Sequence, residues 1–523
     1  MLMNKVLYFI SFNMEPRFKM SASFGVHFGN TSSCVAVYRD GITDVIANDL
    51  GDRVTPCIVA FTDHDQAVGA AAKQGLIRNV GNSVCNVKQV IGRRSDDPVV
   101  TEYKKKSAVK VVDKGGLPAY EVEYKESTKQ VTPLEIAETI FRNLLETAQS
   151  HGGSGIKNSV LTVPLSFNTE QKEAIRQAAT KAGFKVLRLI SEPSAAVLAS
   201  DLGQKDISEQ SIALVFRLGG LSSDASLVQI QSGLLRILAS CSTTELGGDK
   251  FTDVLTKHLA TEFQRINRCN ILENHRSMAK LHRAAETCKY SLSTLDNSQC
   301  SVDSLHEGLD FNSSVSRARF ESLCSSLVQQ CTQLIDKVLK EANLSREAIT
   351  EVILCGGGAK IPFVQRTVRD LFPDADLLNS INPDEVLAVG AAKQAAMLSS
   401  HEDEDIRLNA ESAKVECISK TISIKSAVES GDVLVPVFPK LSPLHSRKHM
   451  TFNLGEEQTS FLLEICEVDR DQVTTLAQIV MRELNPSSSI STTFHLRREG
   501  SLHVTCMEEA SNKTDSVIVE VAS

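Results

Sequence analysis

Three glycine-rich turns are the first features of this sequence that indicate a chemistry. Residues 29–32 read Gly-Asn-Thr-Ser, residues 219–222 read Gly-Gly-Leu-Ser, and residues 356–358 read Gly-Gly-Gly. Glycine lets backbone N–H groups approach a phosphate with no Cβ in the way. One such turn is equally typical of an ordinary hairpin, but two matched hairpins and a third turn that opens a helix favour phosphate binding. The sequence lacks the P-loop pattern GxxxxGK followed by Ser or Thr.

Lys88 and Glu192 are candidate catalytic side chains. Lys88 stands among apolar neighbours, and Glu192 precedes a proline at a position that suits the start of a helix. On spacing alone, a surface lysine and a helix cap explain these residues better than catalysis does. His445 and His449 are four positions apart in a region with strand periodicity and without a neighbouring cysteine, so we assign them to the surface rather than to zinc.

The elements that carry the turns are repeated within the chain. Residues 24–38 and 212–230 both read as a strand, a glycine turn and a second strand. Helices and strands follow each hairpin: Asn168 with Gln171 predicts a capped helix that ends at Gly183, and Pro362 opens a helix in the second half. The sequence therefore predicts an α/β fold with duplicated halves that face one another.

The composition changes after residue 398. Residues 399–405 are small, polar and acidic, which is typical of an exposed linker. Beyond about Val415 apolar residues alternate with polar ones, which indicates strands and no long helix. We therefore predict an unstructured extension at 1–22, an α/β domain at 23–398, a linker at 399–412 and a short all-β sandwich domain at 413–523.

Composition excludes some classes of protein. The 523 residues have a formal net charge of −8, which excludes a generally basic nucleic-acid coat, so we expect no direct nucleic-acid binding. No apolar run approaches the roughly 18 residues that span a bilayer, so we expect no membrane partner. The 13 cysteines form no CxxC pair, which favours buried reduced thiols and a cytosolic, cytoplasmic location.

Further motifs carry a resemblance to a known family. They are Lys-x-x-Ile-Gly-Arg at 88–93, Leu-Arg-Leu-Ile-Ser-Glu-Pro-Ser-Ala-Ala at 187–196, Leu-Gly-Gly-Asp at 246–249, Ser-Arg-Ala-Arg-Phe-Glu at 316–321 and Ile-Asn-Pro-Asp-Glu at 381–385. In this order, and with the two hairpins, the chain resembles the DnaK-type, seventy-kilodalton heat-shock chaperones from Ser23 to about residue 520. The resemblance implies an actin-like ATPase domain with two lobes around a nucleotide cleft, followed by a peptide-binding β sandwich.

The resemblance also implies a site for ATP or ADP. The catalytic positions that it implies are Lys88, Glu192, Ser222 and Asp224. The cofactor-binding positions that it implies are Gly29, Asn30, Thr31, Ser32, Arg217, Gly219, Gly220, Gly247, Gly248, Asp249, Glu286, Lys289, Ser293, Gly356, Gly357, Lys360 and Asp384. We assign no metal ligand.

Several positions depart from the family pattern. Typical members have aspartates, which hold waters on the nucleotide's magnesium, where this chain has His27 and Arg217. The other departures are Asn30, Leu221, Lys250 and Tyr290, where the family has Thr, Gly, Asp and Arg. We therefore expect a preserved pocket with a degraded catalytic centre, weakly held magnesium, and weak or absent ATP hydrolysis. Two orientations of Arg217 stay open, either against phosphate oxygens or out in solvent.

The linker and the end of the chain also depart from the family. Residues 399–408 contain Ile406 and Leu408 but no leucine run, and the sequence stops at Ser523, where a typical member continues into a helical lid. This combination resembles the atypical lidless subfamily of the eukaryotic ribosome-associated complex. That resemblance implies a stable heterodimer with a J-domain co-chaperone, ribosome attachment through this partner, and nascent polypeptides as clients.

Two other functions remain as alternatives. One is an independent ATP-hydrolysing, peptide-binding chaperone, and the other is a sugar or acetate kinase on the same actin-like fold. The β domain disfavours a kinase, and the altered hairpins disfavour efficient hydrolysis. The β domain itself has two candidate roles, as an open peptide groove or as a docking surface for the J-domain partner, and we prefer docking.

Overall fold

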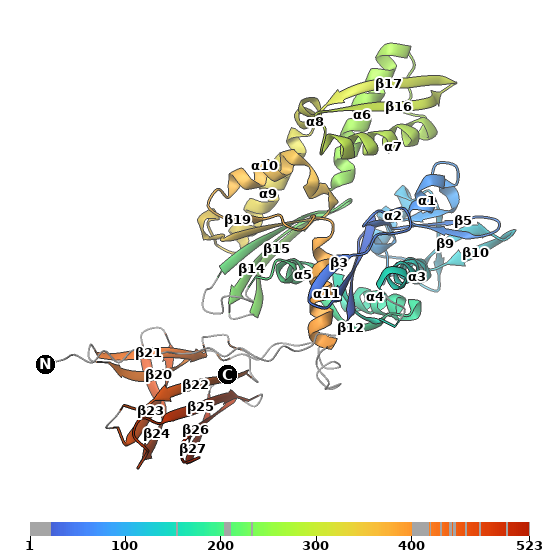
Figure 1. Cartoon of the computed structure of the whole chain (residues 1–523). Helices are drawn as coiled ribbons and strands as arrows, with labels where there is room; N and C mark the ends of the chain where they lie inside the picture. The colour runs from blue at the N-terminus through green and yellow to red at the C-terminus, as the bar shows by residue number, and fades with distance from the viewer. Residues whose placement is uncertain are drawn as a thin grey trace.

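The structure is a computed structural model, and Figure 1 shows the path of the chain. It describes residues 22–152, 155–202, 211–231, 234–399, 418, 420–428, 431–438, 442, 446–455, 458–469, 472–497 and 500–521. Apart from residues 22 and 399, the predicted extension at 1–22 and the predicted linker at 399–412 lie outside the described residues, as does His445.

The first lobe is built on a sheet with strand order β12-β11-β1-β2-β3, to which β4 is added beside β2. Its strands are β1 (Ser23–Phe28), β2 (Ser32–Arg39), β3 (Ile42–Val45), β4 (Thr55–Pro56), β11 (Asn158–Val163) and β12 (Lys185–Ser191). Strand β1 runs antiparallel to β2 and parallel to β11. Both β1 and β11 are buried along nearly their whole length, as central strands covered on both faces must be.

The second lobe repeats this arrangement in the strand order β15-β14-β13-β18-β19. Its strands are β13 (Ser211–Leu218), β14 (Ser223–Gln231), β15 (Leu234–Thr243), β18 (Glu351–Cys355) and β19 (Asp376–Leu378). Strand β13 runs antiparallel to β14 and parallel to β18, as β1 does to β2 and β11. The predicted duplication of an actin-like α/β fold is confirmed.

Helices flank both sheets, and those at Asn168 and Pro362 begin where the sequence predicts. They include α3 (Pro133–Gly152) and α4 (Thr169–Ala182) in the first lobe, and α9 (Ser325–Glu341) and α10 (Pro362–Leu371) in the second. The predicted capping box is present at α4, where Asn168 and Gln171 exchange side-chain and backbone hydrogen bonds. Gly183 ends this helix at a φ of 109°, which favours glycine.

Two helices lie between the sheets and join the lobes (Figure 1). They are α5 (Glu192–Ala199) and α11 (Val386–Ser399), and α11 packs against both α5 and β1. A Cβ on Gly390 would lie 1.8 Å from the Ala195 carbonyl oxygen, so these helices are in backbone contact. A single hydrophobic cluster contains Val160 of the first sheet, Val215 of the second sheet and Ala388 of α11. This shared core fixes the two lobes against each other.

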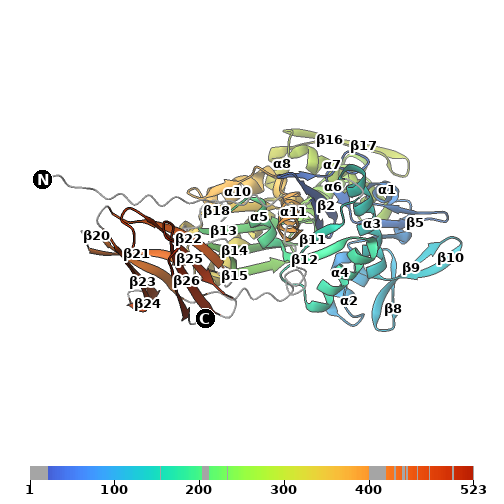
Figure 2. The ribbon, with the colours of Figure 1, turned by 60° about the horizontal axis from the view of Figure 1, so that its bottom comes forward.

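Further elements complete both lobes, and Figure 2 shows most of them. In the first lobe these are β5 (Ile58–Phe61), β6 (Gln66–Val68), α1 (Ala70–Gly75), η1 (Val80–Asn82), β7 (Ser83–Cys85), η2 (Val87–Gln89), α2 (Pro98–Lys106), β8 (Lys110–Lys114), β9 (Leu117–Tyr124) and β10 (Ser127–Val131). In the second lobe they are α6 (Gly248–Asn267), α7 (His275–Leu292), β16 (Asn297–His306), β17 (Leu309–Ser316), α8 (Arg317–Leu323), η3 (Arg346–Ala348) and η4 (Gly357–Lys360).

The C-terminal region folds into two four-stranded sheets, β21-β20-β23-β24 and β22-β25-β26-β27. The strands are β20 (Thr421–Val428), β21 (Gly431–Phe438), β22 (Ser446–Asn453), β23 (Ser460–Asp469), β24 (Gln472–Arg482), β25 (Ser489–Leu496), β26 (Ser501–Glu508) and β27 (Thr514–Glu520). Alternate residues of β25, such as Ile490 and Phe494, are buried in one core shared by both sheets. The predicted β sandwich is confirmed, and His449 lies on its exposed surface.

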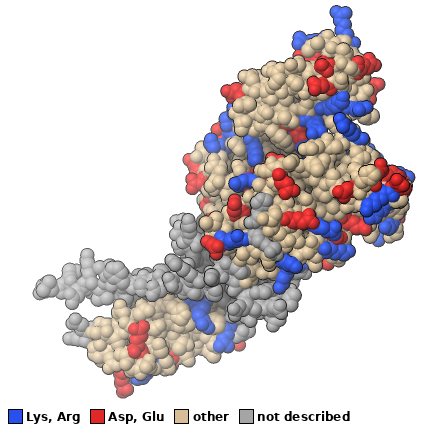
Figure 3. Space-filling model, turned by 45° about the vertical axis from the view of Figure 1, so that its right-hand side comes forward, with Lys and Arg blue, Asp and Glu red and all other residues tan. Residues whose placement is uncertain are grey.

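Surface charge, helix hydrophobicity and the state of the cysteines are relevant to the partners and the environment of the chain. Figure 3 shows Lys and Arg interspersed with Asp and Glu on the face in view, without one dominant sign. No described helix combines the length and the apolar character needed to cross a bilayer. Twelve of the cysteines lie among the described residues; all twelve are free thiols and ten are buried.

Candidate functional site

The turns of the two matched hairpins have the same closing geometry. The Gly29 N–H donates to the Ser32 carbonyl at 3.0 Å, and the Gly219 N–H donates to the Ser222 carbonyl at 2.9 Å. The two turns also touch across the lobes, because a Cβ on Gly220 would lie 2.4 Å from the Thr31 hydroxyl oxygen. The structure therefore brings the predicted residues 29–32 and 219–222 together.

The third turn connects β18 to η4. Gly356 has a φ of 83°, and a Cβ there would lie 2.5 Å from the Leu218 carbonyl oxygen, so this position requires glycine. Gly358 is equally crowded by Leu218. In contrast, a Cβ on Gly357 would meet no atom within 4 Å. Only Gly357 of this turn therefore leaves space for a ligand to approach the backbone.

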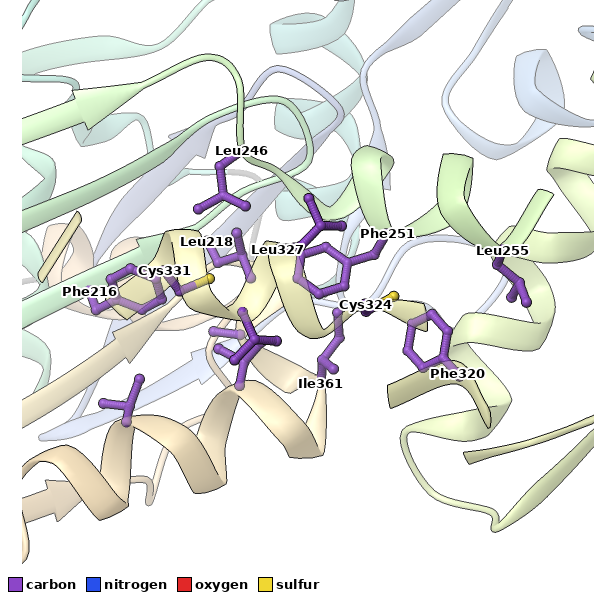
Figure 4. Close-up of a cluster of buried hydrophobic side chains, with 14 of the residues drawn as sticks. Phe216, Leu218, Leu246, Phe251, Leu255, Phe320, Cys324, Leu327, Cys331 and Ile361 are labelled. Atoms are coloured by element: carbon purple, nitrogen blue, oxygen red, sulfur yellow. The ribbon is translucent and has the colours of Figure 1, made fainter. Parts of the chain in front are cut away.

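Gly247 and Gly248 lie at the start of α6 and pack against the turn at residues 219–222. The Gly248 and Asp249 N–H groups donate to the Gly219 and Gly220 carbonyls at 2.8 and 2.9 Å. A hydrophobic core that includes Leu218, Leu246 and Phe251 lies beneath this contact (Figure 4). The glycines permit close packing, and the backbone donors of Gly248 and Asp249 are used within the protein.

The predicted catalytic residues form one ion-pair network. Lys88 Nζ lies 2.9 Å from Glu192 Oε1, and Arg217 Nε lies 3.0 Å from Glu192 Oε2. The Arg217 guanidinium also donates to Ser222 Oγ at 2.9 Å and pairs with Asp224. Glu192 is in the first lobe and Arg217 in the second, so this network crosses between the lobes.

Burial and opposite charges set the protonation of this network. Burial opposes ionisation of Glu192, but Lys88 and Arg217 outweigh it and lower the pKa of Glu192 to about 2. Burial also opposes the charge of Arg217, but Glu192 and Asp224 raise its pKa above the ordinary value. The Arg217 side chain is only 13% exposed, so the solvent-facing orientation is wrong.

His27 takes no part in the ion pairs. Its Nδ1 lies 2.7 Å from the Thr162 hydroxyl, and desolvation lowers the pKa of His27 to about 3. The imidazole is therefore neutral at physiological pH. The net charge of the centre is then zero, because two cations, Lys88 and Arg217, balance two carboxylates, Glu192 and Asp224.

The remaining charged and hydroxyl side chains predicted in the second lobe have partners within the protein. Lys289 is buried, and its ammonium donates to the Gly248 carbonyl at 2.9 Å. The exposed Tyr290 donates to Glu286 at 2.8 Å, and Ser293 donates to the Lys289 carbonyl at 3.2 Å. Lys360 pairs with Asp384 at 2.6 Å. The Asp249 side chain lies against His282 instead of these groups.

Sequence reasoning missed three features of this region. Lys73 pairs with Glu286 at 2.8 Å and links α1 to α7 across the lobes. Thr162 partners His27. A cavity of about 220 Å³ lies beside the charged centre, and its lining includes Ser226, Ser240 and Ser242. No short motif marks these residues, because each contact joins segments that are distant in the sequence.

The residues fit a nucleotide better than they fit a hydrated metal ion. The amide oxygen of Asn30 is buried and has no hydrogen-bond partner among the described residues, and Gly357 faces open space, so both can receive a polar ligand. In contrast, Glu192 and Asp224 are already bonded to cations. Carboxylate oxygens help to hold a magnesium hydration shell, and here both oxygens of Glu192 and one oxygen of Asp224 already lie against cations.

Two lobes of common topology around paired glycine turns define an actin-like nucleotide-binding protein with an appended β sandwich. A family profile described as Hsp70 protein matches residues 23–523, and the chain belongs to this family. The predicted resemblance to the seventy-kilodalton chaperones is confirmed, and the kinase alternative is wrong.

Individual relatives match almost the whole chain. The heat shock 70 kDa protein 14 of Danio rerio is 46% identical over 506 residues, which cover 96% of this chain and 99% of that protein. The Mus musculus protein of the same name is 44% identical, and the heat shock 70 kDa protein 14-B of Xenopus laevis is 42% identical; both matches cover 96% of this chain and 100% of the relative. The chain is thus an Hsp70-family chaperone that binds ATP or ADP. Chaperones of this family bind J-domain co-chaperones and client polypeptides.

Proposed function

We propose that this chain is an atypical Hsp70 that holds ATP for long periods, hydrolyses it slowly or not at all, and acts with a J-domain co-chaperone at the ribosome. The observation that carries the proposal is the position of Arg217, which pairs with Glu192 and Asp224 at the point where the family has a magnesium-shell aspartate.

Charge explains why this substitution separates binding from hydrolysis. With aspartates at positions 27 and 217, the five side chains of the centre would sum to −3, whereas the chain as it stands sums to zero with His27 neutral. A site with net negative charge repels a nucleotide unless a cation is bound, but a neutral site does not. ATP binding should therefore need little magnesium, which is held weakly. Hydrolysis should be slow, because His27 and Arg217 replace the two aspartates that position the metal's waters in the family.

The test restores the family carboxylates. ATP binding is measured by calorimetry with magnesium and with EDTA, and hydrolysis is measured by single turnover on the same preparation. We expect binding in both conditions and little turnover in the parent chain. In the double variant Arg217→Asp/His27→Asp, binding should become dependent on magnesium. Arg366→Asp, in an exposed ion pair on α10, controls for the exchange of an arginine for an aspartate.

Two outcomes contradict this part of the proposal. One is turnover in the parent chain at the rate of an ordinary family member. The other is binding that requires magnesium in the parent chain as strongly as in the double variant. Either result favours the alternative of an independent ATP-hydrolysing chaperone, which the intact Lys88–Glu192 pair supports.

The partner part of the proposal rests on the β domain and on charge. We propose a stable heterodimer in which the β domain is mainly a docking surface, and ribosome attachment in the cytosol through the J-domain partner. An acidic chain with a net charge of −8 is poorly suited to hold ribosomal RNA directly. Nascent polypeptides are the proposed clients of the complex.

Removal of residues 413–523 tests this division of labour. If the β domain docks the partner, the truncated chain should lose co-purification with the J-domain protein, and the parent chain should sediment with ribosomes only when this partner is present. Full partner binding by the truncated chain, together with loss of nucleotide-responsive peptide binding, would contradict docking and favour a peptide clamp.

A further inference from the structure

Three side chains that can bind a metal converge outside the charged centre. Asp249 and Asp253 lie one turn apart on α6, and His282 lies opposite them on α7. Its Nε2 is 3.3 Å from Asp249 Oδ1 and 3.4 Å from Asp253 Oδ1. One ligand atom from each residue lies within 4.8 Å of the other two.

These distances suit a shared ion better than hydrogen bonds. A charge-assisted N–H···O bond is about 2.7–2.9 Å long, and both separations are longer than this. Two ligand atoms about 2.0–2.1 Å from a tetrahedral zinc ion lie about 3.3–3.4 Å apart. Both observed separations therefore match the edges of a zinc coordination tetrahedron.

The ligand types and their exposure select the class of ion. An imidazole with two carboxylates suits zinc and neighbouring transition metals, whereas magnesium prefers oxygen ligands and retains its waters. The side chain of His282 is 34% exposed, that of Asp249 is 47% exposed and that of Asp253 is 45% exposed. An ion can therefore enter and keep a water as its fourth ligand. Lys250 and Lys257 lie near enough to Asp253 to lower the affinity, but they provide no ligand.

We propose that Asp249, Asp253 and His282 form a zinc-class divalent-metal site on α6 and α7, with one coordination position open to water. The Asp249 N–H also donates to the Gly220 carbonyl at 2.9 Å. A bound ion would therefore hold the start of α6 against the turn at 219–222. The site does not involve Arg217, so it stands whether or not ATP is hydrolysed.

The experiment uses the full chain without nucleotide and titrates it with Co²⁺, which reports its geometry by visible absorption, and then with Zn²⁺ in competition. We expect the intense absorption of tetrahedral Co²⁺ in the parent chain and its loss in His282→Gln and in Asp253→Asn. Removal of a direct ligand should weaken Zn²⁺ binding by at least the 10-fold to 100-fold or so that outer partners contribute. His258→Gln, another histidine of the same pair of helices outside the cluster, is the matched control.

Thermal unfolding provides a second readout. Zn²⁺ should raise the melting temperature of the parent chain and of His258→Gln but not of the two ligand variants, each compared with itself without metal. Equal Co²⁺ spectra in the parent and both ligand variants would overturn the proposal. Strong sulfur-to-cobalt charge-transfer bands would overturn it as well, because they would place the ion on cysteines.

Discussion

The two hairpins of the nucleotide cleft accommodate a basic residue at the same position in opposite ways. His27 and Arg217 each lie two residues before the turn glycine, and their cross-strand partners are Cys34 and Asp224. Burial raises the pKa of the Cys34 thiol well above its usual range, so no charge faces His27 across the hairpin. Desolvation of His27 outweighs the charge of Glu192 and keeps the imidazole neutral. Arg217 faces a carboxylate and stays charged.

This difference shows that the residue across the hairpin decides whether a basic residue at the family's aspartate position is neutral or charged. A basic group without a partner in this cleft loses its proton, and one with a carboxylate partner becomes part of an ion-pair network. The first hairpin therefore keeps a neutral turn, and the second contributes an internal cation. The predictions below test this contrast.

Removal of the cation should have the largest effect. Arg217→Ala leaves the partly buried Asp224 without its partner and removes one partner of the buried Glu192, so the free energy of unfolding should fall by about 3 kcal/mol. His27→Asn, which disturbs one hydrogen bond, should cost about 1 kcal/mol. Chemical denaturation of both variants measures the two values.

A double variant sharpens this result. Arg217→Ala/Asp224→Asn removes the unpaired carboxylate as well, so its loss of stability should be smaller than the sum of the two single losses. Additive effects, or equal losses for Arg217→Ala and His27→Asn, would show that the two hairpins do not differ in the way described.

Acid should affect the first hairpin selectively. The pKa of His27 is about 3 in the folded chain and about 6.5 when unfolded, so the unfolded chain binds the extra proton between these values. The contribution of His27 to the free energy of unfolding is fully present above pH 6.5 and decreases as the pH is lowered towards 3. Between pH 7.5 and pH 5 the parent chain should lose about 2 kcal/mol more than His27→Asn. Parallel pH profiles for the two proteins would contradict a neutral, desolvated imidazole.

Two glycines of the third turn have different roles, since Gly356 is needed for packing and Gly357 leaves room for a ligand. Gly356→Ala forces a side chain into a left-handed backbone against Leu218, so its unfolding free energy should fall by about 1–2 kcal/mol. Gly357→Ala meets open space, so its stability should stay within about 0.5 kcal/mol of the parent while ATP affinity falls. Melting temperature and calorimetric titration of the two variants give these values. Unchanged ATP affinity in Gly357→Ala would place the nucleotide elsewhere.

Local patterns in the sequence predicted the elements well. The repeated hairpins, the capping box at Asn168 and the alternation around Phe494 each depend on residues close in sequence. The partners within the site could not be predicted in this way. Lys88 and Glu192 are separated by 104 positions, and His27 and Thr162 by 135, so no local pattern encodes their contacts.

The direction of a side chain was also beyond the sequence. Arg217 had a solvent-facing and a phosphate-facing orientation open to it, and the structure instead directs it into the Glu192–Asp224 pair. That choice depends on the desolvation cost of two carboxylates from different lobes, which is defined only once the lobes are packed. Asp249 similarly lies against His282 of the next helix.

The smallest effect is expected at the exposed contact between the lobes. Lys73 and Glu286 also form an ion pair across the cleft, but their side chains are 34% and 25% exposed, whereas Glu192 and Arg217 are 6% and 13% exposed. Water and salt screen the outer pair, so a double-mutant cycle of Lys73→Ala and Glu286→Ala should give a coupling of about 0.5 kcal/mol or less. That coupling should disappear at high salt, while the loss caused by Arg217→Ala should persist. A coupling above about 2 kcal/mol at the outer pair would show that closure of the cleft depends on its rim as much as on its buried centre.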